Sequence, residues 1–150
     1  MGNEWTGIDG YGMTLLVNGD ILVCGGQWTS NCTLYASVGN KWSTFSPLPM
    51  AIVGLAMITL HDSGPYVFGG FNYPTILNTV YTFDATNAWT PRTPMPRLLN
   101  FHTAVALDTN TAMVCGGLTT NITIQSQCYK YTACICGMHS FAGIIFVSQY

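Results

Sequence analysis

Four of the six cysteines stand where two equivalent disulfide bonds could form. Cys24 and Cys115 each end a short apolar run directly before a Gly-Gly pair, and each is followed by a second cysteine, Cys32 or Cys128. If these cysteines lie on neighbouring strands, the period-2 alternation of side chains places both second cysteines on the same face. We therefore expect Cys24–Cys32 and Cys115–Cys128 bonds. Four buried free thiols are the alternative, because free cysteine is common in protein cores.

The other reactive side chains do not form a catalytic or metal-binding pattern. Cys134 and Cys136 are separated by one residue, and no other Cys or His spacing completes a four-ligand set. The histidines, His61, His102 and His139, fall at unlike places along the chain, and we expect them on the surface. The aspartates mostly stand in turn-forming segments, and no pair is spaced for acid–base work. The sequence thus predicts no catalytic residue, no metal site and no cofactor.

Two glycosylation sequons bear on the compartment in which the protein works. Asn31 and Asn121 each begin an Asn-x-Thr triplet, although such triplets arise by chance in a chain rich in Asn and Thr. Disulfide bonds persist in oxidising compartments. Together, the sequons and the paired cysteines favour an extracellular location over a cytoplasmic one.

The composition excludes several classes of function. Hydrophobic residues make up 49% of the chain and charged residues only 7%, with four Lys and Arg in total and a net charge of −2. A protein that grips nucleic acid needs a basic surface, which these residues cannot supply. No stretch reaches the roughly 18 apolar residues of a membrane-spanning helix. We expect no nucleic-acid partner and no membrane span.

A period of 44 to 47 residues organises the chain. Apolar runs at residues 21–24, 66–68 and 112–115 all end in Gly-Gly, and Trp42 and Trp89 are also one period apart. A fixed period of this size indicates an array of similar supersecondary units.

Each period contains four short segments rich in Val, Thr, Tyr and Phe and bounded by Gly, Pro and Asn, which are strand signals. The links are too short for crossover helices, so neighbouring strands are expected to be antiparallel. The second strand is apolar at consecutive positions, which predicts burial on both faces. We align Tyr35, Tyr81 and Tyr129 as equivalents in the third strand, and Phe68 and Val80 as the middle copy's counterpart of a cysteine pair. The fold class is all-β.

The clearest copy resembles the kelch repeat. It runs from the Gly69-Gly70 doublet through Tyr81 and Trp89 to the Met-Pro-Arg segment at residues 95–97. The resemblance covers roughly residues 11–132. It implies a kelch-type β-propeller, in which each repeat is a four-stranded antiparallel blade around a central axis.

About three blades are expected, followed by an atypical tail. The blade units span about residues 11–45, 54–92 and 102–132; the tail, residues 133–150, matches nothing upstream, and the third copy lacks the repeat Trp. Propellers usually close with four to eight blades. A partial propeller leaves two blade faces open, so we expect self-association through these faces.

Resemblance to kelch propellers implies a non-catalytic scaffold that binds a protein partner through one face. The loops between strands two and three and between strands four and one open on that face. The candidate binding residues break the period in these loops and include aromatic and Arg side chains, which often anchor interfaces: Trp28, Phe71, Asn72, Tyr73, Arg97 and Asn100. Two alternatives stay open, a fragment of a galactose-oxidase-like copper enzyme and an extracellular carbohydrate or adhesion module.

Overall fold

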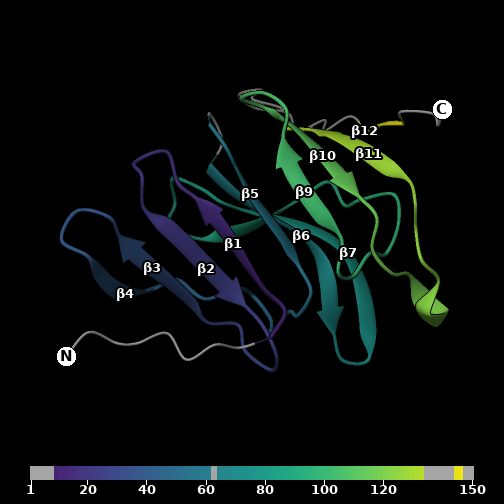
Figure 1. Cartoon of the computed structure of the whole chain (residues 1–150), viewed down its shortest axis with the longest axis horizontal. Helices are drawn as coiled ribbons and strands as arrows, with labels where there is room; N and C mark the ends of the chain where they lie inside the picture. The colour runs from purple at the N-terminus through teal and green to yellow at the C-terminus, as the bar shows by residue number, and fades with distance from the viewer. Residues whose placement is uncertain (1–8, 62–63, 134–143, 147–150) are drawn as a thin grey trace.

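The computed structural model describes residues 9–61, 64–133 and 144–146, which form three four-stranded antiparallel sheets and one short 3-10 helix (Figure 1). The first sheet contains β1 (Tyr11–Leu15), β2 (Ile21–Gly25), β3 (Cys32–Ala36) and β4 (Lys41–Phe45). The second contains β5 (Ala56–Leu60), β6 (Gly64–Asn72), β7 (Thr75–Phe83) and β8 (Trp89–Arg92). The third contains β9 (Thr103–Ala106), β10 (Thr111–Cys115), β11 (Cys128–Thr132) and β12 (Ile144–Phe146), with the 3-10 helix η1 (Thr120–Ile122) between β10 and β11.

In all three sheets the strands follow sequence order. The first strands of the sheets, β1, β5 and β9, lie next to one another, β1 beside β5 and β5 beside β9. This is the arrangement of three neighbouring propeller blades around an axis. The predicted all-β partial propeller is therefore confirmed.

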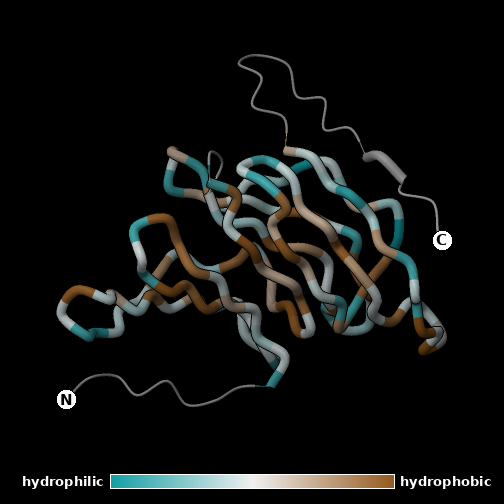
Figure 2. The backbone as a smooth tube through the Cα atoms, turned by 45° about the horizontal axis from the view of Figure 1, so that its top comes forward, coloured by the Kyte–Doolittle hydropathy of each residue, from teal (hydrophilic) through white to brown (hydrophobic). Residues whose placement is uncertain are grey.

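The hydrophobic core consists of two layers, one between each pair of neighbouring sheets. Figure 2 shows hydrophobic stretches running along the strands and hydrophilic stretches mainly at the turns. Val67 of β6 belongs to the layer shared with the first sheet, while Phe68 belongs to the layer shared with the third, and both are fully buried. Sheets on both sides thus explain the consecutive apolar residues of the second strand, as predicted.

The sheet-to-sheet linker passes so close to the Gly-Gly doublet that a side chain would not fit there. Gly70 has φ +100°, and a Cβ built on it would lie 2.3 Å from Cγ2 of Ile52. Next to this glycine, Phe71 and Val53 exchange two backbone hydrogen bonds, of 2.8 and 3.0 Å. The glycine therefore lets the linker bond to the end of β6.

The strand registers correct the alignment of the repeat tyrosines. Tyr35 pairs with Trp42 at the position where Phe83 pairs with Trp89. The residues before the first two Gly-Gly doublets, Cys24 and Phe68, pair with Cys32 and Val80. Tyr35 and Phe83 each stand three residues after these partners. Tyr35 is thus equivalent to Phe83 and not to Tyr81, as the spacing had suggested. The error is two residues, so it leaves the predicted face unchanged.

The fourth strand of the third sheet comes from the segment that the repeat spacing left unmatched. In β12, Ile144 pairs with Tyr131, which is the register position that Trp42 and Trp89 occupy in the other two sheets. The connection between the third and fourth strands is longer here, so counting from Trp89 does not locate the strand.

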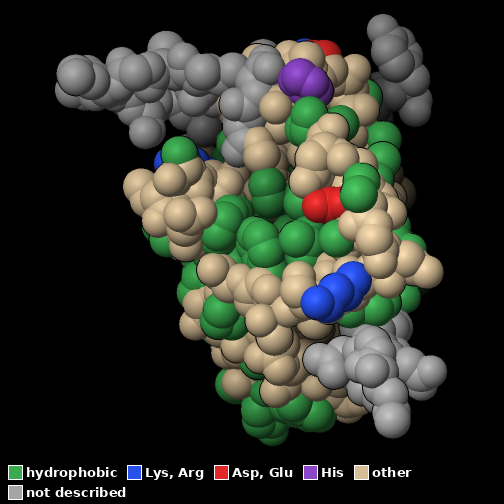
Figure 3. Space-filling view, turned by 90° about the vertical axis from the view of Figure 1, so that its left-hand side faces the viewer, with side chains coloured by type: hydrophobic (Ala, Val, Ile, Leu, Met, Phe, Trp, Pro, Cys, Tyr) green, Lys and Arg blue, Asp and Glu red, His purple; other side chains and the backbone are tan. Residues whose placement is uncertain are grey.

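Among the described residues, the first and third sheets each have one face without a neighbouring sheet. Figure 3, which looks at the side where the first sheet lies, shows hydrophobic side chains gathered across the middle of that side. On the exposed face of β1, Met13 and Leu15 are 56% and 64% exposed.

The role of Gly70 can be tested against a glycine with the same backbone conformation in open space. Gly39 has φ +98° with nothing within 4 Å of an added Cβ. Gly39→Ala is expected to cost about 1 kcal/mol because an L side chain is disfavoured at positive φ. Gly70→Ala is expected to cost about 1–3 kcal/mol more because of the clash with the linker. Urea unfolding of both variants measures the difference, and equal losses would contradict the close-approach explanation.

Candidate functional site

A groove of about 1050 Å³ lies at one end of the sheets. The connections β2–β3, β6–β7 and β10–β11 contribute to its walls, together with the two linkers that join one sheet to the next. Loops carry recognition residues more often than strands do, because their sequences are less constrained by packing.

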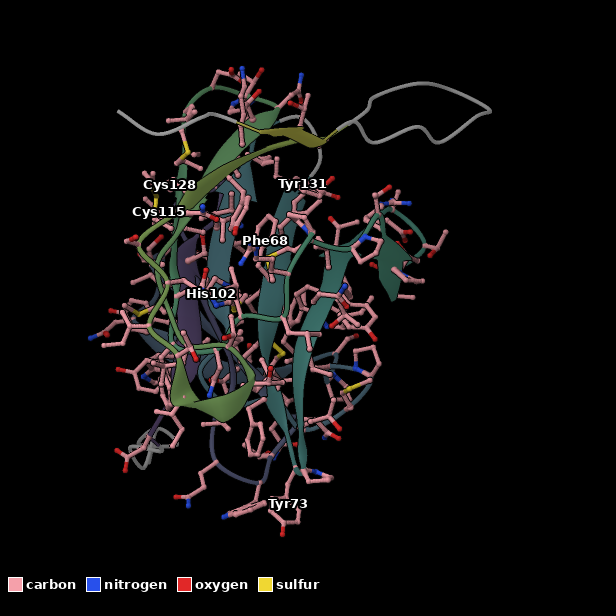
Figure 4. All side chains as sticks on the ribbon, turned by 90° about the vertical axis from the view of Figure 1, so that its right-hand side faces the viewer. Phe68, Tyr73, His102, Cys115, Cys128 and Tyr131 are labelled. Carbon is pink, nitrogen blue, oxygen red and sulfur yellow. A yellow bond between two sulfur atoms is a disulfide. The ribbon has the colours of Figure 1, made fainter. Side chains whose placement is uncertain are left out.

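The longest wall of the groove is the β6–β7 hairpin. Its strands continue past the Gly-Gly doublet, with Phe71 opposite Ile76 and Asn72 opposite Thr75. Tyr73 lies at the tip, 71% exposed, and Figure 4 shows it at the far end of the hairpin. The hairpin therefore extends aromatic side chains beyond the sheet.

Two blades contribute to an exposed aromatic cluster at the rim of the groove. Trp28, in the β2–β3 connection, is 73% exposed and has φ +64°. Its ring centroid lies 6.2 Å from that of Tyr73 in an edge-to-face arrangement, and Phe71 lies 6.2 Å from Tyr73 in the same manner. Large aromatic side chains left in water are costly, and such rims commonly mark binding sites.

Five of the six candidate binding residues line this groove, namely Trp28, Phe71, Asn72, Tyr73 and Asn100. Arg97 is not part of the lining. Its Nη1 donates a 3.3 Å hydrogen bond to Oε1 of Gln125. The structure therefore brings together the candidates of both loop classes but leaves the arginine aside.

Several groove residues had no distinguishing signal in the sequence. Phe101 lies in the second linker with φ +53° and is 61% exposed, and Ile122 of η1 is 80% exposed. Val53 and Leu118 add further apolar lining. In the sequence, Ile122 is distinguished only as the middle residue of a sequon. Phe101, Val53 and Leu118 look like ordinary strand residues.

Two amide side chains of the groove, Asn72 and Asn100, are held within the fold. Nδ2 of Asn72 donates a 2.7 Å hydrogen bond to the carbonyl oxygen of Ala51, which ties the hairpin to the first linker. Asn100 is 8% exposed, and its Oδ1 lies against Gly54 without a hydrogen-bond partner among the described residues. The accessible surface of the groove is therefore mainly apolar.

His102 is buried beside Gly69 and Gly117, which corrects the expectation of a surface histidine. It is 7% exposed, and within the described part of the chain neither ring nitrogen has a hydrogen-bond partner. Burial lowers the pKa of His102 to about 4, while the nearby Phe68 backbone acts weakly in the opposite direction. Because a charged imidazole is poorly solvated there, the folded protein holds His102 neutral at pH 7. Figure 4 labels it between the second and third sheets.

Both expected disulfide pairs are bonded in the structure. Cys24 and Cys32 face each other across β2 and β3 and are buried between the first two sheets. Cys115 and Cys128 occupy the same register position in the third sheet and are half-buried (Figure 4).

In the second sheet the corresponding residues, Phe68 and Val80, pair directly and are fully buried, as the sequence predicted. The disulfides therefore fill a slot that is otherwise taken by an apolar pair.

The remaining candidates contribute no second site within the described residues. Asn31 is exposed in the β2–β3 connection, whereas the side chain of Asn121 lies outside the described part of the chain. The same holds for Cys134, Cys136 and His139. In the described ranges, no three His, Cys, Asp or Glu side chains come together as metal ligands, and no helix is long and apolar enough to cross a membrane.

Asp84 and Asp108 act as turn formers. Asp84 accepts a 2.9 Å hydrogen bond from the backbone N–H of Thr86, and Asp108 accepts one of the same length from Asn110. The hydrogen bond from the Thr86 hydroxyl, together with that from the Thr86 N–H, lowers the pKa of Asp84, and the hydrogen bond from Asn110 lowers the pKa of Asp108. Their role in the turns is structural.

Comparisons with known proteins agree with this architecture. Residues 66–96 match the family model of the Kelch motif. "Kelch repeat and BTB domain-containing protein 8" of Danio rerio is 30% identical over 112 residues, which cover 63% of this chain and 18% of that protein. A solved structure, "Structure of YjhT", superposes with a TM-score of 0.78 at 12% identity, covering 95% of this chain and 47% of the other.

The fold is therefore that of a partial β-propeller, and residues 66–96 of its middle blade match the Kelch motif. The recognition of a partial kelch-repeat array from the sequence is confirmed. The chain spans less than a fifth of the length of its curated relative and about half of the solved propeller.

Burial of His102 predicts a pH dependence of stability. The unfolded chain takes up a proton at a pKa near 6.5, but the folded protein takes it up only near pH 4, so stability is full above about pH 6.5 and falls as pH drops toward 4. The expected loss between these limits is about 3 kcal/mol. Urea midpoints between pH 7 and pH 4 measure it, and His102→Leu should flatten the profile.

His61→Gln is the matched control, because His61 is exposed in the β5–β6 turn. This variant is expected to follow the parent protein. An unchanged slope in His102→Leu would show that another group carries the pH dependence.

Proposed function

We propose that this chain is a non-catalytic protein-interaction module whose groove binds a segment of a partner polypeptide. The observation that carries the proposal is the exposed aromatic pair Trp28 and Tyr73, which come from different blades and meet at the groove rim. Such anchors give large contact area with little loss of side-chain freedom. The kelch match supports it, because kelch propellers commonly serve as binding scaffolds.

The chemistry of the groove indicates what kind of segment fits. Asp9 is the one charged residue in the lining as described, and the rest are apolar or neutral polar side chains. A strongly charged peptide would lose hydration and gain at most one ionic partner, Asp9, from this lining. The partner segment is therefore uncharged and presents apolar or aromatic side chains to Trp28, Phe71 and Phe101.

Two other functions receive less support from the described residues. A copper enzyme needs clustered ligands, and the part of the chain that the structure describes contains no such cluster. A carbohydrate site needs free amide and hydroxyl groups beside its aromatic platform. Here the Asn72 amide already donates to Ala51, which favours a polypeptide ligand over a sugar.

Selection of peptides from a random phage-displayed library against the immobilised chain tests the groove. Synthetic copies of the selected peptides are expected to lose at least about tenfold in affinity to Trp28→Ala and to Tyr73→Ala, since truncating an anchor typically costs more than 1 kcal/mol. Val38→Ala, in the exposed β3–β4 turn, is the control and should bind like the parent. Peptides that bind all three variants equally would place recognition outside the groove, and a glycan array in parallel would reveal a sugar ligand.

An oxidising, extracellular compartment is part of this proposal. The bonded cysteine pairs and the exposed Asn31 support it. Secreted expression is expected to yield both disulfides in non-reducing peptide maps and a glycan at Asn31 that an amidase removes with a mass shift. Free thiols at all four positions together with an unmodified Asn31 would instead favour the cytoplasm.

A further inference from the structure

The first and third sheets each expose an apolar stripe on the face that no other sheet covers. On the first sheet, Met13, Leu15 and Val17 are 56%, 64% and 59% exposed. On the third sheet, Val105 and Leu107 are 57% and 51% exposed. Met13 and Leu15 lie on one face of β1 and Val105 lies on β9, while Val17 and Leu107 follow the ends of these strands.

The second-sheet equivalents of Met13 and Val105 are buried because both faces of the second sheet have a neighbour. Met13 lies opposite Val23 as Met57 lies opposite Val67, and Met57 is only 7% exposed. The exposed stripes are therefore packing surfaces that lack their partner sheets.

The exposed stripe of the third sheet also has a buried equivalent in the second sheet. Val105 holds the position of Ile58, since their partners Met113 and Tyr66 each stand two residues before the last residue of the apolar run. Ile58 is 5% exposed, packed against the third sheet, whereas Val105 is 57% exposed.

Both existing interfaces use the same two faces. The face of the first sheet that carries Leu22 and Cys24 packs against the face of the second that carries Met57 and Val67. The second sheet then offers its opposite face, with Ile58 and Phe68, to the third. The open face of the third sheet is equivalent to the Leu22 and Cys24 face of the first sheet. The open face of the first sheet is equivalent to the Met57 and Val67 face of the second sheet. The two open faces are therefore complementary.

Lys130 on the third sheet would also gain a favourable contact if the open face of the third sheet packed on the open first sheet of a second copy. Lys130 stands two residues after Cys128, as Leu34 stands two residues after Cys32, and Leu34 packs against the cluster that contains Trp89. The equivalent of Trp89 on the open first sheet is Trp42. Lys130 of one copy would thus lie over this indole, where a cation–π contact is favourable.

We propose that two copies of this chain associate head to tail, the open face of each third sheet packing on the open first sheet of the other copy, to close a ring of six blades. The chain superposes on about half of a solved propeller, covering 47% of it, so two copies account for a full turn. A head-to-tail contact closes into a ring when its rotation fits and otherwise grows into filaments. Six blades is within the usual range of closed propellers.

Native mass spectrometry and sedimentation velocity of the purified chain test this assembly. The expected species has twice the 16.3 kDa mass of one chain. Leu15→Lys and Val105→Glu are each expected to weaken the dimer at least tenfold, because each places a charge in both contacts. An equimolar mixture should recover a heterodimer, which has one unaltered contact and one Lys–Glu contact.

Val38→Lys is the matched control, since Val38 is 90% exposed in the β3–β4 turn and away from both stripes, and its dimer should be unchanged. A monomer at all concentrations would overturn the proposal and leave further blades of a longer polypeptide as the occupant. Open-ended oligomers would overturn ring closure. A dimer weakened by Leu15→Lys but not by Val105→Glu would indicate a symmetric contact between first sheets and would also overturn it.

Discussion

Packing of one four-stranded sheet against the next is the interaction on which the rest of this structure depends. A single sheet of this size cannot bury both of its apolar faces, so each blade needs neighbours. The second sheet shows the completed arrangement, with Val67 and Phe68 fully buried on opposite sides. The disulfide cysteines of the first sheet lie in the layer that contains Val67. Within their own sheet they hold the register position that Phe68 and Val80 hold in the second sheet. Each disulfide joins two paired strands of one sheet and does not link one sheet to the next.

The groove is a consequence of that stacking. Because the sheets are arranged around one axis, their β2–β3, β6–β7 and β10–β11 connections emerge at the same end. The Gly-Gly doublets let the linkers bond closely to the strand ends, as Val53 does to Phe71. Rigid blades thus hold loops of unrelated sequence next to one another, and Trp28 meets Tyr73 although they are far apart in the chain.

The wrong match between the repeat tyrosines did not change any predicted side-chain face, because it preserved the alternation of side chains along the strand. Tyr35 was matched to Tyr81 when its true equivalent is Phe83, a shift of two residues that leaves the face unchanged. The predicted cysteine pairs were unaffected for this reason. The burial of His102 could not be predicted in this way, because it depends on the close approach of Gly69 in β6 and of Gly117, which follows β10.

The sequence by itself determined the four-stranded unit, its period, the pairing of cysteines and the loops that carry variable residues. These follow from local rules, namely alternation along a strand, two-sided apolar runs and turn formers such as Asp84. Only the tertiary structure decided that Phe101 and Ile122 join the groove, that Arg97 does not, and that Ile144 takes the place of the missing Trp. Those outcomes depend on contacts between separate blades and on loop lengths, and neither leaves a regular spacing in the chain.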